Sequence, residues 1–202
     1  MKQKFYEYNT YKKYFYNNGV DPIETDTMTK TSIFKYSEHN DLDSKVLEVD
    51  YIGNKISFVI VLPNERNGLN SLKQMINAKS FDRAIKSMQL WYVKVYLPKF
   101  TFEKSYDLMD EINHKPIALT KKADFSGLTS DPRIVCKIKH KVIVDFHEKG
   151  TEAAPVNSTS FNEDLTGSFE SELEFIADHP FLYFIRDKTN GIILFSGQIN
   201  NF

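Results

Sequence analysis

The chain has 202 residues, a formal net charge of −1 and 26% charged residues, which suits one soluble domain with a substantial core. The near-neutral charge excludes the strongly basic surface typical of proteins that bind nucleic acid or acidic membranes. The single cysteine, Cys136, excludes a disulfide framework and a thiolate metal cluster, and no apolar run is long enough to span a bilayer. We therefore expect no nucleic-acid partner, no membrane insertion, and no metal or other cofactor.

The first part of the chain is predicted to be mostly β-structure. Residues 1–30 lack a steady hydrophobic period and predict loops around one short strand at 14–16, with a turn at Asn17-Asn18-Gly19. Residues 32–36 alternate and predict a strand. Two further strands, 45–52 and 55–62, are joined by Gly53-Asn54, which is a hairpin signal.

The middle of the chain mixes helices and strands. Apolar residues recur at helical spacing over 69–76 and again over 81–88, which predicts two short helices. A strand over 91–96 ends at Leu97-Pro98-Lys99-Phe100, and Trp91 is expected in the core. A third helix is predicted over 106–112 with Ser105 as its N-cap. Residues 123–128 predict a compact turn.

The last third predicts strands on both sides of a polar stretch. A strand over 134–146 precedes it, and a hairpin of 181–186 and 192–196 turned at Asn190-Gly191 follows it. This final hairpin is the most apolar segment, so it is expected in the centre of the core. The stretch between, at about 148–174, is rich in small and polar residues. A loop of this length is usually functional or disordered.

Five segments in this order resemble the serpin family. The two most specific are Glu148 to Ala154, which resembles the base of the serpin reactive-centre loop, and residues 175–186, which resemble the C-terminal serpin signature. The other three are residues 46–51, Leu97-Pro98-Lys99-Phe100 with Tyr106-Asp107-Leu108, and residues 123–127. The resemblance implies an α+β, multi-sheet serpin-like fold that is partial. It also implies that residues 1–202 form a single partial domain, similar to the second half of a serpin and lacking the N-terminal helices and part of the large central sheet.

The resemblance implies that the protein is not an enzyme but a bait for endopeptidases. In serpins the reactive-centre loop is attacked by a serine-type, in some cases cysteine-type, protease, and the cut loop then inserts into the large sheet. Insertion of a strand requires small side chains and a flexible pivot. The implied loop hinge consists of Glu148, Lys149, Gly150, Thr151, Glu152, Ala153, Ala154, Pro155 and Val156.

The family's usual spacing from Glu148 places the cleavable bond at Asp164–Leu165, to within one or two residues. Aspartate before the bond suits a protease with a basic specificity pocket, such as a caspase or a granzyme-B-like enzyme. The target endopeptidase is the expected partner, and the chain is expected as a monomer or paired with a missing N-terminal half.

Two features of the hinge argue against efficient inhibition. Pro155 lacks an N–H and would remove a ladder hydrogen bond from an inserting strand, which slows insertion. Just after the hinge, Asn157-Ser158-Thr159 is a glycosylation sequon. A glycan there would block insertion, so either the chain avoids the secretory route or it is not an efficient inhibitor. Residues 1–9 show no signal peptide, so the compartment stays open between extracellular, the family default, and cytoplasmic.

The resemblance assigns supporting roles to three further residues. Lys99 and Glu148 match a pair that closes the entrance for the loop in some serpins; the alternative is two exposed charges of little energetic value. His140 matches a histidine under the central sheet.

Other histidines and the cysteine favour structural roles. Cys136 and His140 are four residues apart in a predicted strand, about 13 Å, which is too far for a thiol–imidazole hydrogen bond. His179 is expected to be a hydrogen-bonded turn residue rather than a metal ligand.

Three functions are compatible with these observations. The first is a serpin-type endopeptidase inhibitor, inefficient or inactive as a truncated form. The second is a non-inhibitory serpin-like binding protein, and the third is a truncated product without independent function.

Overall fold

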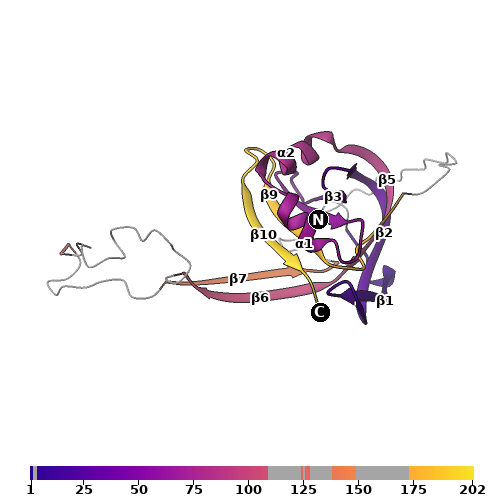
Figure 1. The fold of residues 1–202 in the computed structure, drawn as a ribbon, viewed down its shortest axis with the longest axis horizontal. Coiled ribbons are helices and arrows are strands. Elements are labelled where there is room, and N and C mark those ends of the chain that lie inside the picture. The colour runs from indigo at the N-terminus through magenta and orange to yellow at the C-terminus, as the bar shows by residue number, and fades with distance from the viewer. Residues whose placement is uncertain (2–3, 109–123, 125, 128–137, 149–172) are drawn as a thin grey trace. The chain divides into compact units, whose positions relative to one another are not determined.

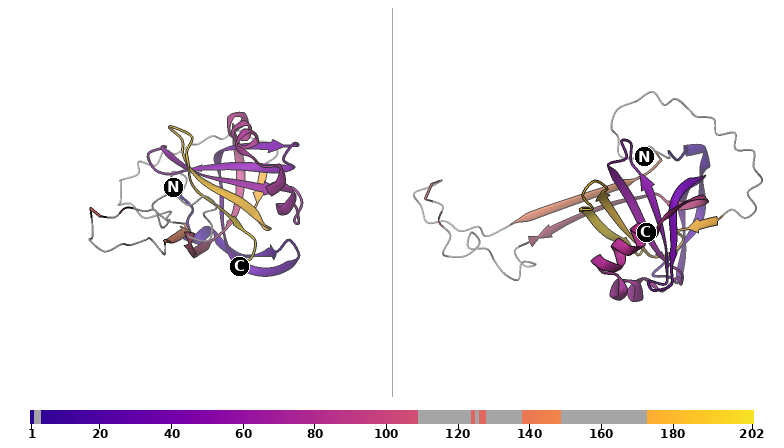
Figure 2. Two further views of the ribbon diagram at one scale, coloured as in Figure 1. Left: turned by 60° about the vertical axis from the view of Figure 1, so that its left-hand side comes forward. Right: turned by 90° about the horizontal axis from the view of Figure 1, so that it is seen from above.

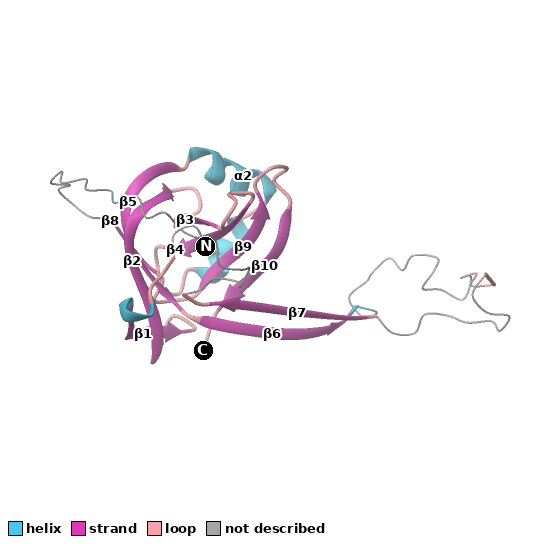
Figure 3. Ribbon diagram, turned by 180° about the vertical axis from the view of Figure 1, so that it is seen from behind, coloured by secondary structure: helices cyan, strands magenta, loops and turns pink. Residues whose placement is uncertain are grey.

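The computed structural model describes residues 1, 4–108, 124, 126–127, 138–148 and 173–202 of the chain. Strands dominate it, as Figure 3 shows. The large sheet contains β1 (Thr10–Asn17), β2 (Asp21–His39), β3 (Ser44–Asp50), β4 (Ile56–Pro63), β5 (Gln89–Pro98), β8 (Leu173–Ile176), β9 (Phe181–Asp187) and β10 (Ile193–Ile199). A second sheet contains β6 (Phe100–Asp107) and β7 (Lys139–Phe146), and the helices are the short η1 (Glu7–Asn9), α1 (Leu69–Met75) and α2 (Ala78–Ser87).

The large sheet has the strand order β10-β9-β4-β3-β2-β5-β8, with β1 paired to β2. Figure 1 labels several of these strands, among them β10, β9, β3, β2 and β5. Neighbours are antiparallel except β5 and β8, which run parallel. Residues 1–100 and 146–202 form one compact unit and residues 101–145 form another. The mixed architecture agrees with the predicted α+β class.

The N-terminal loops predicted for residues 1–30 are wrong, because most of these residues form a β-hairpin. β1 and the first part of β2 pair from Thr10↔Met28 to Asn17↔Asp21. The turn itself was predicted correctly: Asn18 and Gly19 both have positive φ. The predicted strand at 14–16 lies within β1 but is too short, because only Phe15 of β1 is fully buried and most other positions carry Tyr, Lys or Thr.

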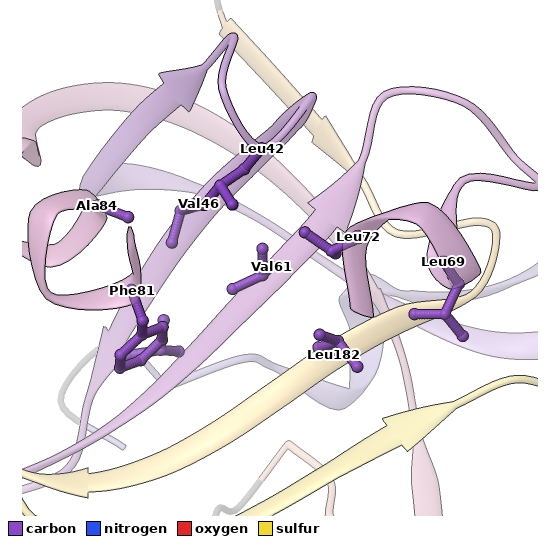
Figure 4. Close-up of a cluster of buried hydrophobic side chains, with 9 residues drawn as sticks. Leu42, Val46, Val61, Leu69, Leu72, Phe81, Ala84 and Leu182 are labelled. Atoms are coloured by element: carbon purple, nitrogen blue, oxygen red, sulfur yellow. The ribbon is translucent and has the colours of Figure 1, made fainter. Parts of the chain in front are cut away.

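One face of the sheet packs against the two helices, both of which were predicted. α1 and α2 contribute Leu69, Leu72, Phe81 and Ala84 to a buried cluster, shown in Figure 4. The strands contribute alternate residues, whose side chains point to the face that carries the helices. Val46 of β3 and Val61 of β4 are among them and lie opposite each other in the sheet. The β3–β4 hairpin, also predicted, turns at Gly53 and Asn54, both with positive φ.

Aromatic rings form the packing on the opposite face. Phe58 of β4 stacks on Tyr183 of β9 with ring centroids 5.5 Å apart, and on Phe146 at 4.5 Å. Phe100 lies 5.3 Å from Phe146. Because Phe58 alternates with the helix-facing Val59, this face is a second core layer. This aromatic packing fixes the position of Phe146, which lies two residues before Glu148.

Three further predictions are wrong within the described part of the chain. Ser105 lies inside strand β6 and caps no helix; residues 109–112 lie outside the described residues. Trp91 is 46% exposed rather than in the core. Of the final hairpin, β9 is central, but β10 lies at the edge of the sheet, with Ile193, Leu194 and Phe195 exposed. The view from above in Figure 2 shows this C-terminal hairpin in yellow at one side of the large sheet.

A contact at the base of the polar stretch

Glu148 lies two residues beyond β7 and directly before the stretch 149–172. Its side chain is only 6% exposed. Lys99 Nζ is 3.1 Å from Glu148 Oε1, and Thr10 Oγ1 donates a hydrogen bond of 2.6 Å to the same oxygen. The alternative of two exposed charges therefore does not describe this pair, because the carboxylate is buried.

The partners of Glu148 come from separate strand ends. Thr10 is the first residue of β1, and Lys99 lies between β5 and β6, where its backbone N–H bonds to the carbonyl of Asp26 at 2.8 Å. Burial alone would raise the pKa of the Glu148 carboxyl, but the hydrogen bonds of Thr10, the backbone and Lys99 together with the Lys99 charge hold this pKa below its ordinary value. The carboxylate is thus ionised at neutral pH and ties three strand ends together.

The stretch after Glu148 connects two sheets. It follows β7, which pairs with β6, and it ends at Leu173 of β8, which pairs with β5 from Val93↔Leu173 to Tyr96↔Ile176. The predicted hinge residues Lys149, Gly150, Thr151, Glu152, Ala153, Ala154, Pro155 and Val156 lie outside the described residues. The predicted bond Asp164–Leu165 lies outside them as well.

His140 is not brought together with Glu148. It lies in β7 with an exposed side chain, and its ring centroid is 6.4 Å from that of Tyr106 in β6. Cys136 lies outside the described residues.

His179 is a buried hydrogen-bonded residue, as predicted. Its Nε2 lies 2.8 Å from the carbonyl oxygen of Pro63, and its Nδ1 lies 2.7 Å from Asp178 Oδ1. A carbonyl only accepts, so Nε2 carries a hydrogen. His179 therefore joins the end of β4 to the segment between β8 and β9.

Sequence analysis missed a second buried carboxylate, Glu48 in β3. It accepts a hydrogen bond of 2.6 Å from Ser57 Oγ and lies 3.0 Å from Lys35 Nζ and 3.7 Å from Arg186 Nη1. Burial opposes ionisation, yet Ser57, Lys35 and Lys188 keep the pKa of Glu48 below its ordinary value. The pairing of Lys35 with Glu48 across β2 and β3 could have predicted this site, but only if the pairing of these two strands had been known.

Thr10 was also missed as a partner of Glu148, because 138 positions separate the two residues in the sequence.

The described part of the chain shows neither a metal-binding cluster nor a membrane-spanning helix. No three His, Cys, Asp or Glu side chains there are grouped so that they could hold a metal ion. Within the same residues, no helix is both long and apolar enough to cross a membrane.

Comparison with known proteins agrees with the resemblance seen in the sequence. The family model described as Serpin (serine protease inhibitor) matches residues 1–202. Iripin-3 of Ixodes ricinus is 36% identical over 203 residues, covering 99% of this chain and 51% of that protein. Serpin B4 of Homo sapiens is 33% identical over 205 residues, covering 99% of this chain and 52% of that protein.

The fold agrees as well. Thyroxine-binding globulin in complex with thyroxine superposes with a TM-score of 0.79 at 26% identity, over 98% of this chain and 52% of that one. Uncleaved ovalbumin gives a TM-score of 0.79 at 24% identity, over 98% and 50%. The chain thus spans about half the length of the relatives it matches, in agreement with the partial fold expected from the sequence. The chain belongs to the serpin family.

Proposed function

We propose that this chain belongs to a serpin-type endopeptidase inhibitor whose bait segment is the stretch at about 148–174, with Asp164–Leu165 as the cleaved bond. The observation that supports this most is the Lys99–Glu148–Thr10 contact. It anchors the first residue of the proposed hinge, so that the segment after it begins from a fixed point.

The sheet arrangement fits a segment that can add to β7 after it is cut. The proposed hinge follows β7 directly, and among the described strands β7 pairs only with β6. An antiparallel return along the other edge of β7 would give the hinge ladder hydrogen bonds that it lacks as a loop. Each such bond contributes about 0.5–1.5 kcal/mol net.

The proposed target is a protease that recognises an acidic residue before the cleaved bond. A basic specificity pocket would pair with the Asp164 carboxylate, as a charge-assisted hydrogen bond. Caspases and granzyme-B-like enzymes have this preference. Pro155 in the hinge lowers the rate of insertion, so we expect cleavage to outrun trapping and the inhibition to be inefficient.

Limited proteolysis with a granzyme-B-like enzyme tests the assignment of the bond. We expect mass spectrometry to find a single early cut after Asp164, and Asp164→Asn to slow this cut at least about tenfold, since the charge pair in the specificity pocket is lost. Glu163→Gln is the matched control, because it removes the neighbouring carboxylate without touching the cleaved bond. Equal rates for both variants, or a first cut elsewhere in the segment, would reject Asp164–Leu165.

A further inference from the structure

The hairpin of β1 and β2 ends in a two-stranded ribbon. β5 pairs with β2 only from Thr27 onward, and β3 pairs with it only from Lys35 onward. Residues 21–26 of β2 therefore pair with β1 alone among the described strands. A two-stranded ribbon is at best marginally stable in water by itself, so this ribbon, residues 12–26, depends on contacts from elsewhere in the chain.

β1 itself contributes little burial to the ribbon. Phe15 is fully buried, and the other residues of β1 are half-buried or exposed. The backbone N–H of Tyr16 donates a hydrogen bond of 2.7 Å to the carbonyl of Asp178, and the Arg66 guanidinium lies 3.6 Å from the centroid of the Tyr16 ring. Further contacts come from the segment that follows β10.

That segment, residues 200–202, bonds to the turn of the ribbon and is here called the clasp. The backbone carbonyl of Asn200 accepts a hydrogen bond of 2.8 Å from the N–H of Asn18, and the Asn200 side chain donates to Asn18 Oδ1. The N–H of Phe202 donates a hydrogen bond of 3.0 Å to Asn17 Oδ1. The clasp thus satisfies backbone and side-chain groups on both residues of the turn.

The clasp also packs on the buried residue of β1. The ring of Phe202 meets that of Phe15 edge to face, with the ring centroids 4.7 Å apart. In Figure 1 and in the left view of Figure 2, the C-terminus lies beside the β1–β2 hairpin. Because Phe15 is the only fully buried side chain of β1, this aromatic pair is a main apolar contact of the ribbon.

The opposite end of β1 carries the Glu148 contact. Thr10, whose hydroxyl bonds to Glu148, begins β1 and pairs with Met28 of β2. Lys99 donates its backbone N–H to the carbonyl of Asp26 in β2, at 2.8 Å. Both partners of Glu148 are therefore attached to the hairpin, so displacement of the ribbon displaces them as well.

We infer that the clasp positions the Glu148 contact from the opposite end of the hairpin. It holds the ribbon in place, and the ribbon keeps Thr10 and Lys99 on the Glu148 carboxylate. Residues 200–202 are thus positioning residues, which act through β1 and β2. Release of the clasp frees the first residue of the proposed hinge, a consequence that rests on the proposed function.

A carbon-13 NMR titration of the Glu148 carboxyl in the whole 202-residue chain tests this coupling. Burial raises the pKa of Glu148, but the bonds from Thr10 and Lys99 hold this pKa below its ordinary value of 4.5. In Phe202→Ala we expect the pKa of Glu148 to rise toward 4.5, the value of a carboxyl released to water. A role of Phe202 confined to its own surroundings would leave this pKa unchanged.

Hydrogen exchange of the β1 amides, measured on the same samples, reports on the ribbon itself. Phe202→Ala removes the aromatic pair and should speed this exchange at least about tenfold. Asn200→Ala leaves that pair in place and removes only the side-chain bond to Asn18. We expect it to speed the exchange at least about threefold and to shift the pKa of Glu148 in the same direction.

Phe195→Ala is the matched control. Phe195 of β10 is 42% exposed, close to the 41% of Phe202, but it pairs with Ile185 of β9 instead of contacting β1. The Glu148 pKa and the β1 exchange should equal those of the unaltered chain. Melting temperatures show whether each variant is folded, and Asn200→Ala carries the test if Phe202→Ala fails to fold.

Two results would overturn the inference: an unchanged Glu148 pKa in the folded clasp variants, or an equal shift in the control. No protease enters this titration. The clasp can therefore fail this test while cleavage after Asp164 and strand addition succeed, and the proposed bait can fail its own tests while the clasp stands.

Discussion

At the scale of single residues, the contribution of Glu148 to the stability of the fold depends on its hydrogen-bond and charge partners. A buried carboxylate is costly unless hydrogen bonds and an opposite charge compensate it. Thr10 and Lys99 provide that compensation on one oxygen. The sequence resemblance led to Lys99 and Glu148, but Thr10 is visible only once β1 is folded beside them, because no local pattern links positions so far apart.

Removal of Lys99 should destabilise the chain in a pH-dependent way. We expect Lys99→Met to lower the free energy of unfolding at pH 7 by about 1–3 kcal/mol, since the Glu148 carboxylate then stays buried with fewer partners. The pKa of Glu148 is lowered in the folded chain. The contact therefore contributes fully above the ordinary value of 4.5, and its contribution is lost as the pH falls from there through the lowered pKa.

Urea unfolding at neutral pH and at successively lower pH measures this effect. Lys86→Met is the matched control, because Lys86 pairs with Asp82 on the exposed surface of α2, and such a pair contributes about 0.3–0.5 kcal/mol. A loss for Lys99→Met as small as that of the control, or one that grows on acidification, would contradict the proposed anchor.

At the scale of elements, prediction succeeded where turn residues and burial both left a signal. Gly53-Asn54 and Asn190-Gly191 mark the two hairpins, and the helical apolar spacing of 69–88 matches α1 and α2. It failed where few side chains of a strand are buried. β1 has one fully buried residue, and β6 has mostly exposed side chains, so neither shows the alternation of a half-buried strand.

The start of α2 provides a test of local stability. The Asn77 side chain accepts hydrogen bonds of 3.0 Å from the backbone N–H groups of both Lys79 and Ser80. In return, the backbone N–H of Asn77 donates a hydrogen bond of 2.9 Å to Ser80 Oγ, which completes a capping box. We expect Asn77→Ala to lower the free energy of unfolding by about 0.5–2 kcal/mol. Chemical denaturation measures the difference.

The same substitution inside α1 serves as the control. Asn70 is exposed in the first turn of that helix and is not its N-cap, and alanine has the higher helix propensity, so Asn70→Ala should be neutral or slightly stabilising. If Asn77→Ala behaves like Asn70→Ala, the cap makes no contribution to stability.

At the scale of the whole molecule, a strand's apolar content proved a poor guide to its place in the sheet. The final hairpin is the most apolar segment, yet only β9 is central, between β4 and β10. β10 is an edge strand with exposed Ile193, Leu194 and Phe195. Strand order comes from long-range pairing, which periodicity does not encode. The proposed bait stretch, by contrast, came from composition and family resemblance, and its residues 149–172 stay a prediction.

Thermal unfolding of the chain before and after a single cut in the stretch 149–172 is the most direct test of a bait that becomes a strand. If the start of the stretch adds to the edge of β7, which has eight residues, about six new ladder bonds contribute about 3 kcal/mol or more. For a chain of this size we expect the melting temperature to rise by at least roughly 6–12 °C. An unchanged or lowered melting temperature after complete cleavage would contradict strand addition and favour an exposed binding segment.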